Sequence, residues 1–462
     1  MKQISGTGKY QENSTFMAML KACAKKKDIC EGTRLHAYIL KEGLLEKSPY
    51  LGSSLISMYT KCGVLSKAQQ VLEELPIRDI VCWNALITGY AQHGQCHNAI
   101  SCFDRMQGDD GLSPNEVTFI CILKACGSTG SIEIGKQIHD KILSMGLLEK
   151  YVMLGTALVD MYAKCGIVAK AQEVLEELPI RNIVSWNALI AGYAQQGQGH
   201  EVLNCFQRLK SEGLSPDEVT FLAILKACGS IGAIEKGTQI YDEIVSRRLL
   251  EKHNLLGNAV VDMYAKCGVL AKAQEVLEEL PVQNIVSWNT VIGGYAQQGG
   301  QGHEALHCLK RLQRKGLCPN AMTFLCLLSA CCRSGLLDKA RELYAKMTPE
   351  YGITPDIEHH TCMVVAFGLV GRFDEAMSMI KVMPSNYLEV WLSLLGTCKK
   401  WENVKLGRLA FDQALQLDSG CAAAYILMAS IFEAAGMQDN AEHVKAKGRK
   451  YTSWEVEGNS VG

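Results

Sequence analysis

Cysteine and histidine are the residues best suited to chemistry in this sequence, which contains 20 cysteines and 11 histidines. A zinc deaminase, for example, needs a His-x-Glu segment followed by Cys-x-x-Cys to hold its metal and to supply its general acid. No Cys-x-x-Cys pair occurs, and His303-Glu304 lacks the required spacing. The adjacent residues His359 and His360 point in different directions on a helix. We therefore expect no metal, no cofactor and no catalytic residue, and we predict that the protein is not an enzyme.

A second set of polar residues recurs at a regular distance along the chain. The dipeptide Trp-Asn begins at Trp83, Trp186 and Trp288, which are separated by 103 and 102 residues. The cysteine of Lys-Ala-Cys follows the same period at Cys126 and Cys228. A period near 102 residues is too long for one supersecondary unit, so it must divide further.

The period divides into three units, of which 218–253, 254–284 and 183–217 are examples with lengths of 36, 31 and 35 residues. Each unit contains two apolar stretches at helical spacing, separated by a turn that contains glycine. One such pair of helices exposes an apolar face that it cannot bury alone, so neighbouring pairs must stack. The predicted fold is an all-α solenoid of stacked helix-turn-helix repeats.

Composition agrees with a repeat array. A single compact core rarely grows beyond roughly 250–300 residues, whereas this chain has 462 residues and a formal net charge of −1. No run of about eighteen apolar residues occurs, so we expect no membrane span. Residues 1–12 form a leader that is neither a secretory signal nor a clear transit peptide. In a long chain without a signal peptide, we expect the cysteines to be reduced.

The unit heads resemble those of pentatricopeptide repeats, specifically the mixed subclass that alternates standard (P), long (L) and short (S) motifs. The resemblance rests on Ile-Val-Ser-Trp-Asn-Ala-Leu-Ile-Ala-Gly-Tyr (183–193), Glu-Val-Thr-Phe-Leu-Ala-Ile-Leu-Lys-Ala-Cys (218–228) and Gly-Asn-Ala-Val-Val-Asp-Met-Tyr-Ala-Lys-Cys-Gly (257–268). The resemblance implies a right-handed superhelix that binds single-stranded RNA. In L-S-P order, eleven repeats tile residues 13–387: 13–48, 49–79, 80–115, 116–151, 152–182, 183–217, 218–253, 254–284, 285–320, 321–356 and 357–387.

The C-terminal part resembles the end of plant organellar RNA-editing factors. Residues 389–398 and 423–432 look like the two tetratricopeptide-like extension (E) motifs of that subgroup, which we place at 388–450. Residues 451–462, which include Ser-Trp-Glu-Val (453–456), resemble the start of the segment that leads to a DYW deaminase domain. The sequence stops where that domain would begin, so either the chain is truncated or a deaminase is recruited in trans.

In this family one base is read by two or three side chains per repeat. The resemblance places the readers at the fifth and last residues of each standard or short repeat. The pairs are Ser53 with Asp79, Asn84 with Asn115, Thr156 with Asn182, Asn187 with Asp217, Asn258 with Asn284, and Asn289 with Asn320. The second residue would sandwich the base, as Val81, Val184 and Val286 could.

The family's code assigns guanine to a small hydroxyl with Asp, adenine to a small hydroxyl with Asn, uracil to Asn with Asp, and cytosine or uracil to Asn with Asn. The long repeats carry apolar fifth residues and are left unread, as is the last short repeat with Thr361 and Tyr387. The predicted target is 5′-n-G-C/U-n-A-U-n-C/U-C/U-n-n.

Simpler interpretations stay open at each of these positions. Asparagine and aspartate near helix starts can be N-caps. Trp83, Trp186 and Trp288 can be base-stacking platforms or core residues, and we favour the core. Lysines that recur in the short repeats can follow RNA phosphates or simply face solvent. The close match between copies also leaves a designed or recently duplicated array open.

The leading hypothesis is a sequence-specific RNA-binding module that targets organellar C-to-U editing, with residues 388–462 contacting a deaminase or another editing factor. The alternative is a protein–protein scaffold of the tetratricopeptide type, but that family keeps a 34-residue period. From the resemblance we expect an organellar protein, in mitochondria rather than chloroplasts.

Overall fold

The computed structural model describes residues 7–251, 253–383 and 387–458. Within these residues the chain forms helices and no strand, which confirms the predicted all-α fold of stacked helix pairs. Residues 1–6 of the expected leader and residues 459–462 of the expected C-terminal segment lie outside the described residues. The chain divides into two compact units, residues 1–227 and 228–462.

The first unit begins with a helix that starts inside the expected leader. Its helices are α1 (Thr7–Lys26), α2 (Ile29–Lys41), α3 (Leu44–Lys47), α4 (Pro49–Lys61), α5 (Leu65–Glu74), α6 (Ile80–Gln92), α7 (Cys96–Gly108), α8 (Glu116–Thr129), α9 (Ile132–Ser144), α10 (Val152–Lys164), α11 (Val168–Glu177), α12 (Ile183–Gln195) and α13 (Gly199–Ser211). The boundary between the units falls within α14 (Glu218–Ile231).

The second unit continues the series of helix pairs. Its helices are α15 (Ile234–Ser246), α16 (Asn254–Lys266), α17 (Leu270–Glu279), α18 (Ile285–Gln298), α19 (Gly302–Arg314), α20 (Ala321–Arg333), α21 (Leu337–Tyr351), α22 (Ile357–Leu369), α23 (Phe373–Val382), α24 (Leu388–Cys398), the 3₁₀ turn η1 (Lys399–Trp401), α25 (Val404–Leu417), α26 (Ala422–Ala434) and α27 (Gln438–Gly458).

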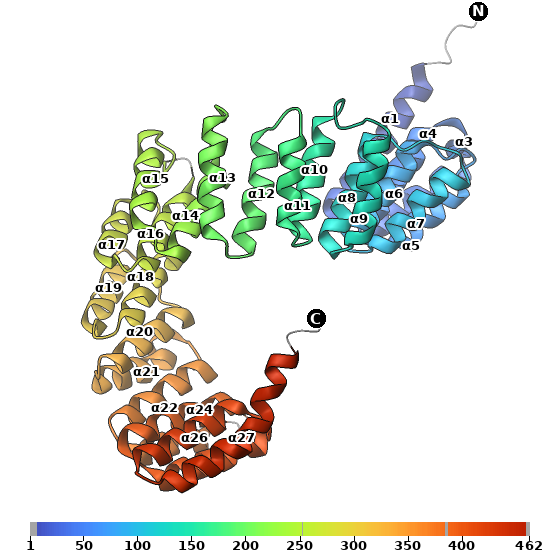
Figure 1. The fold of residues 1–462 in the computed structure, drawn as a ribbon. Coiled ribbons are helices and arrows are strands. Elements are labelled where there is room, and N and C mark those ends of the chain that lie inside the picture. Colours follow the sequence, from blue (N-terminus) through green and yellow to red (C-terminus); the bar gives the residue numbers. More distant parts are fainter. Residues whose placement is uncertain (1–6, 252, 384–386, 459–462) are drawn as a thin grey trace, which may run out of the picture. The chain divides into compact units, whose positions relative to one another are not determined.

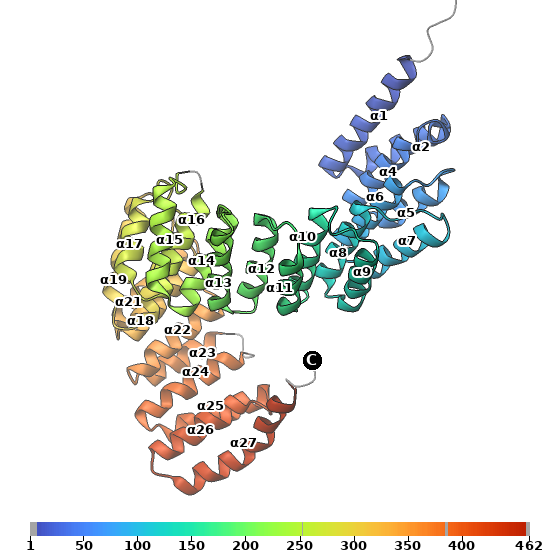
Figure 2. The same cartoon turned by 45° about the horizontal axis from the view of Figure 1, so that its top comes forward.

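The helices stack as pairs in which the first helix contacts the first helix of the next pair. In the first unit α4, α6, α8, α10 and α12 pack on one another in this order, and α5, α7, α11 and α13 each pack on their own partner (Figure 1). In the second unit α16, α18, α20, α22, α24 and α26 form the corresponding row (Figure 2). This stacking brings the first turns of successive first helices together, and these turns carry the predicted reading residues.

Glycine permits both the turns and the close helix contacts. Gly166, between α10 and α11, has φ +80°, a left-handed conformation that glycine adopts at little cost. Gly135 in α9 lies against Met161 of α10, where a Cβ atom would approach the methionine sulfur to 2.6 Å. Both features recur with the repeat, because Gly268 and Gly237 occupy the same places in a later copy.

The recurring tryptophans are core residues and not stacking platforms. Trp83, Trp186 and Trp288 are all 0% exposed. A buried indole N–H needs an acceptor. Trp83 Nε1 donates to Asp110 Oδ2 at 2.7 Å, and Trp186 Nε1 donates to Glu212 Oε2 at 2.8 Å.

The third tryptophan lacks this acceptor. Lys315 stands where Glu212 stands one copy earlier, immediately before the Gly-Leu that follows the second helix. Within the described residues, Trp288 Nε1 and Gln283 Oε1 are buried without a hydrogen-bond partner. In the second copy, Arg181 occupies the place of Gln283 and pairs with Glu212 at 2.9 Å. The third copy therefore lacks, among the described residues, the local polar network that is present in the second copy.

Restoring this network is expected to stabilise the protein. The double variant Q283R/K315E supplies the missing carboxylate, and satisfying a buried N–H contributes about 1 kcal/mol. We expect a higher Tm by differential scanning calorimetry for this variant than for the wild type. The mirror substitution E212K in the second copy is expected to lower Tm. A Tm for Q283R/K315E that is no higher than that of the wild type would contradict the role of the indole contact.

Three further features bear on function. All twenty cysteines lie in the described residues and have free thiols. Among the described helices, none combines the length and the hydropathy of a membrane-spanning segment. In the same part of the chain, no group of three or more His, Cys, Asp or Glu residues is arranged to hold a metal ion.

Candidate nucleic-acid interface

The six residues predicted at the last positions of the repeats all cap the helix that follows. Each side chain accepts the backbone N–H of the third helical residue, at distances of 2.8 to 3.0 Å. The caps are Asp79, Asn115, Asn182, Asp217, Asn284 and Asn320. The capping interpretation therefore describes a role that these six residues do have. The capping hydrogen bond also holds each side chain at the start of a first helix.

The fifth residues are not caps. Asn187 lies one turn inside α12, whose cap is Asn182, and its Nδ2 donates to both carboxylate oxygens of Asp217 at 3.0 and 3.1 Å. Two further predicted pairs are joined in the same way. Asn84 Nδ2 donates to Asn115 Oδ1 at 3.2 Å, and Asn289 Nδ2 donates to Asn320 Oδ1 at 3.1 Å. Three of the six predicted pairs are thus in direct contact across roughly thirty residues of sequence.

The other three pairs are arranged differently. Asn258 and Asn284 are bridged by the hydroxyl of Ser287, which contacts the Oδ1 atoms of both. Within the described residues no hydrogen bond joins Ser53 to Asp79 or Thr156 to Asn182, because each hydroxyl is used by its own helix. Ser53 donates to the carbonyl of Tyr50 at 3.1 Å, and Thr156 donates to that of Val152 at 3.3 Å.

The predicted sandwiching valines are apolar side chains exposed to solvent. Val81, Val184 and Val286 are 52%, 53% and 64% exposed. Sequence reasoning missed that short and long repeats present the same feature at their second positions, where the exposed residues are Tyr50, Val117, Met153, Val219, Leu255 and Met322. The unit boundaries alone could have located these residues, since each is the second residue of a predicted repeat.

In the first unit, polar residues of the fifth positions and exposed apolar residues of the second positions line one groove. A cavity of about 460 Å³ is bordered by Ser53 and Asn84 together with the exposed Val81 and Val117. It also contains Lys61, and the side chains come from α1, α4, α6 and α8. Apolar walls beside polar amide and hydroxyl groups suit a flat heteroaromatic ring with a hydrogen-bonding edge.

The charged side chains on the first helices and at their caps are of both signs. Burial raises the pKa of the Asp217 carboxyl, but hydrogen bonds from Thr220 and Asn187 outweigh it and hold the pKa below its usual value. Asp217 is therefore an acceptor at neutral pH. The recurring lysines divide into two kinds: Lys164 is paired with Asp160 at 2.7 Å, whereas Lys61 lines the groove with Ser57 in the place of that acid.

Known proteins match this chain along most of its length. The family model described as PPR repeat family matches residues 78–128, 181–230 and 283–333, and the PPR repeat model matches residues 53–80, 322–348 and 358–388. An Arabidopsis thaliana protein named as a putative mitochondrial pentatricopeptide repeat-containing protein is 35% identical, over 96% of this chain and 73% of its own length. The chain belongs to the pentatricopeptide repeat family. A relative from the same plant, named as chloroplastic, is 31% identical over 96% of this chain and 51% of its own length.

Solved pentatricopeptide repeat structures share the fold. The crystal structure of PPR10 in complex with an 18-nt psaJ RNA element has a TM-score of 0.71 at 16% identity, and the match covers 88% of this chain and 62% of that chain. The structure of PPR10 from maize has a TM-score of 0.55 at 17% identity, with 95% and 70% covered. At this identity the likeness concerns the fold.

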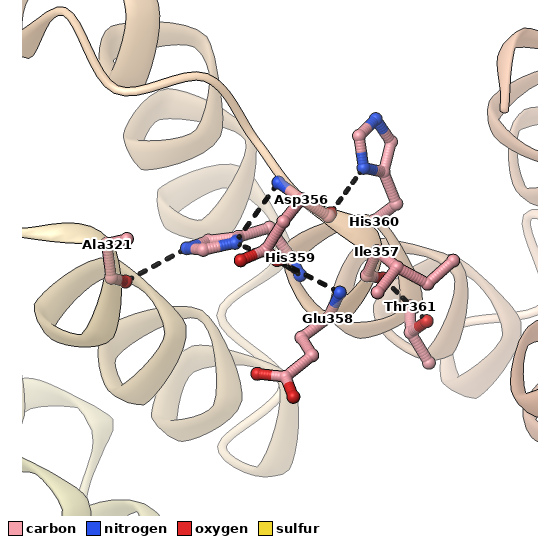
Figure 3. Close-up of polar contacts among 7 residues, drawn as sticks. All are labelled: Ala321, Asp356, Ile357, Glu358, His359, His360 and Thr361. Carbon is pink, nitrogen blue, oxygen red and sulfur yellow. Dashed lines mark hydrogen bonds and ion pairs between the residues drawn. The ribbon is translucent and has the colours of Figure 1, made fainter. Parts of the chain in front are cut away.

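The last short repeat that we predict in this pentatricopeptide repeat protein has a different first turn. Asp356 caps α22, and the buried His359 ring lies between Asp356 Oδ1 at 2.5 Å and the Ala321 carbonyl at 2.9 Å (Figure 3). Thr361, at the fifth position, donates to the carbonyl of Ile357 at 2.8 Å. The adjacent histidines have structural partners, because His360 contacts the Asp356 carbonyl and points away from His359.

Proposed function

We propose that this pentatricopeptide repeat protein binds single-stranded RNA and reads one base per repeat. The observation that carries the proposal is the placement of Asn187 and Asp217. Their polar groups are hydrogen-bonded to each other at the starts of α12 and α14, and the exposed Val184 lies one turn before Asn187. The RNA complex of PPR10, which has the same fold, supports the choice of ligand.

Base selection follows from donors and acceptors on the Watson–Crick edge. Uracil presents an N3–H donor, whereas cytosine presents an unprotonated N3 acceptor. A carboxylate can only accept, so Asp217 favours uracil. An amide both donates and accepts, so the pair Asn289 with Asn320 tolerates cytosine and uracil. The adjacent exposed apolar residue holds the ring by stacking or edge contact, independently of base identity.

The full proposal uses the repeat boundaries predicted above, with eleven repeats over 13–387 in L-S-P order and target 5′-n-G-C/U-n-A-U-n-C/U-C/U-n-n. The apolar fifth residues of the long repeats are half-buried, which supports leaving them unread; they are Met17, Ile120, Leu222 and Leu325. We assign the two helix pairs α24–α27 to the extension motifs, and we propose that they position a deaminase or another editing factor on the bound RNA.

We further propose that recognition, and not chemistry, is the role of this chain in organellar C-to-U editing. Relatives named as mitochondrial and as chloroplastic both support an organelle. Mitochondria are our choice because three of the first five relatives carry that name.

A gel-shift titration tests the proposal. One RNA carries the predicted target, and a second RNA has every readable position changed from purine to pyrimidine or the reverse. We expect much tighter binding to the first, with an affinity that falls as salt rises because bound phosphates release counterions. Equal affinity for the two RNAs would leave RNA binding and reject the base assignments. Absence of binding to both would favour the protein–protein scaffold.

A further inference from the structure

A threonine from the following repeat contacts the reading pair at three places. Thr118, Thr220 and Thr323 are each the third residue of a first helix, and all three are 0% exposed. Each one completes a cap, because its backbone N–H donates to the last residue of the repeat before it. Such capping accounts for the backbone N–H but leaves the direction of the buried hydroxyl unexplained.

At two of the three places the hydroxyl reaches the fifth-residue amide. Thr220 Oγ1 lies 2.7 Å from Asn187 Oδ1, and Thr323 Oγ1 lies 2.7 Å from Asn289 Oδ1. In each case the amide nitrogen donates to the last residue of its own repeat. These two amides are therefore held at both ends, with the oxygen toward threonine and the nitrogen toward the cap.

The hydroxyl proton of Thr323 is best placed in the hydrogen bond to Asn289 Oδ1. The backbone N–H of Asn320 approaches Thr323 Oγ1 at 3.1 Å, which uses a lone pair of the hydroxyl. Asn320 Oδ1 already receives Thr323 N–H at 3.0 Å and Asn289 Nδ2 at 3.1 Å. Asn289 is 9% exposed, and its oxygen has the hydroxyl as its donor among the described residues. A buried acceptor without a donor is costly, so the single proton is best used there.

The first copy has the same three residue types but not this contact. Thr118 Oγ1 donates to Asn115 Oδ1 at 2.9 Å, and Asn115 N–H approaches the hydroxyl at 3.2 Å. Asn84 Oδ1 is buried and has no partner among the described residues. Its amide is held at the nitrogen end alone, by Asn115 at 3.2 Å. The chain thus offers a matched pair of Asn–Asn–Thr sets that differ in one hydrogen bond.

We propose that Thr323 and Thr220 are positioning residues that fix the Asn289 and Asn187 amides and thereby sharpen base selection by the repeat before them. The proposal rests on the proposed RNA readout. It implies that a reading unit includes a side chain of the next repeat. It also implies that the ninth nucleotide, read by Asn289 and Asn320, is selected more strictly than the third, read by the chemically identical Asn84 and Asn115.

The test compares two RNAs that differ at one nucleotide. The measured ratio is the Kd for the RNA with adenine divided by the Kd for the RNA with cytosine. For T323V we expect this ratio at the ninth nucleotide to fall about fivefold, the scale of one lost hydrogen bond. T323S keeps the hydroxyl and should retain the wild-type ratio. T118V is the matched control, because it loses the same cap hydroxyl but no contact to Asn84, and we expect the ratio at the third nucleotide to stay within about twofold.

The outcomes separate this inference from the proposed function. If the wild type and T323V discriminate equally well at the ninth nucleotide, the positioning role is overturned and RNA readout is left intact. Equal losses in T323V and T118V also overturn it, because they would trace the effect to capping. A wild-type protein that shows no discrimination at the ninth nucleotide overturns the base assignment and this inference together.

Discussion

Exchanging Asn187 for threonine and Asp217 for asparagine is expected to change the base preferred at the sixth nucleotide from uracil to adenine. The carboxylate of Asp217 accepts both from Asn187 Nδ2 and, in the proposed complex, from uracil N3–H. Adenine presents an N1 acceptor and an N6 donor, so its N1 lone pair would face a carboxylate that cannot donate. An asparagine at residue 217 can donate to N1 and accept from N6.

The same chain contains the pair that the double variant would create. Thr156 and Asn182 are predicted to read adenine, and the Thr156 hydroxyl is turned to the Val152 carbonyl. A threonine at residue 187 can turn in the same way, which leaves the cap residue to meet the base. We expect a change in preference of about 1–3 kcal/mol, the scale of a good base-edge contact.

Four RNAs that differ only at the sixth nucleotide measure this change in competition binding. The single variant D217N serves as a control, and it should move the preference from uracil toward cytosine because the amide can donate. A uniform loss of affinity for all four RNAs would contradict the proposal. It would show that Asn187 and Asp217 act through capping and helix stacking alone.

Replacing Trp186 with alanine is expected to lower the free energy of unfolding by about 3–5 kcal/mol, the usual cost of removing a buried aromatic side chain. Trp186 is 0% exposed, donates to Glu212 at 2.8 Å, and lies beneath the Arg208 guanidinium at 5.4 Å from the ring centroid. The alanine leaves a cavity and removes the donor that Glu212 accepts from. W186F should cost less, because it keeps most of the apolar volume and loses chiefly the hydrogen bond.

The loss should be local, because repeat proteins are stabilised by contacts between neighbours. Hydrogen exchange followed by mass spectrometry is the appropriate measurement, with reduced protection expected in α12 and α13 and in the pairs that contact them. Since Asn187 follows Trp186 in α12, binding of the predicted target should weaken as well. Unchanged protection in α12 would show that the tryptophan is not central to the packing of its helix pair.

The sequence by itself determined the helix pairs, their stacking and the residue types at the candidate interface. Apolar spacing and glycine turns act over a few residues, so a unit such as 183–217 can be recognised without coordinates. The family resemblance added the fifth and last positions, and three predicted pairs, including Asn187 with Asp217, are in contact. The inference of helix pairs succeeds because it depends on local chemistry that the repeat copies with little change, whereas the reading positions stay a prediction.

Tertiary structure decided which of the similar copies are equivalent in their contacts. Asn84 and Asn289 occur in matching positions, yet the hydroxyl of the following repeat contacts the amide oxygen of Asn289 and not that of Asn84. Trp186 and Trp288 are both buried, yet an acceptor is present for the first and absent among the described residues for the second. The partners lie about thirty residues apart in sequence, and a hydrogen bond depends on tenths of an ångström. Sequence periodicity specifies neither which distant residues meet nor the distance between their atoms, so only the packed helices distinguish these copies.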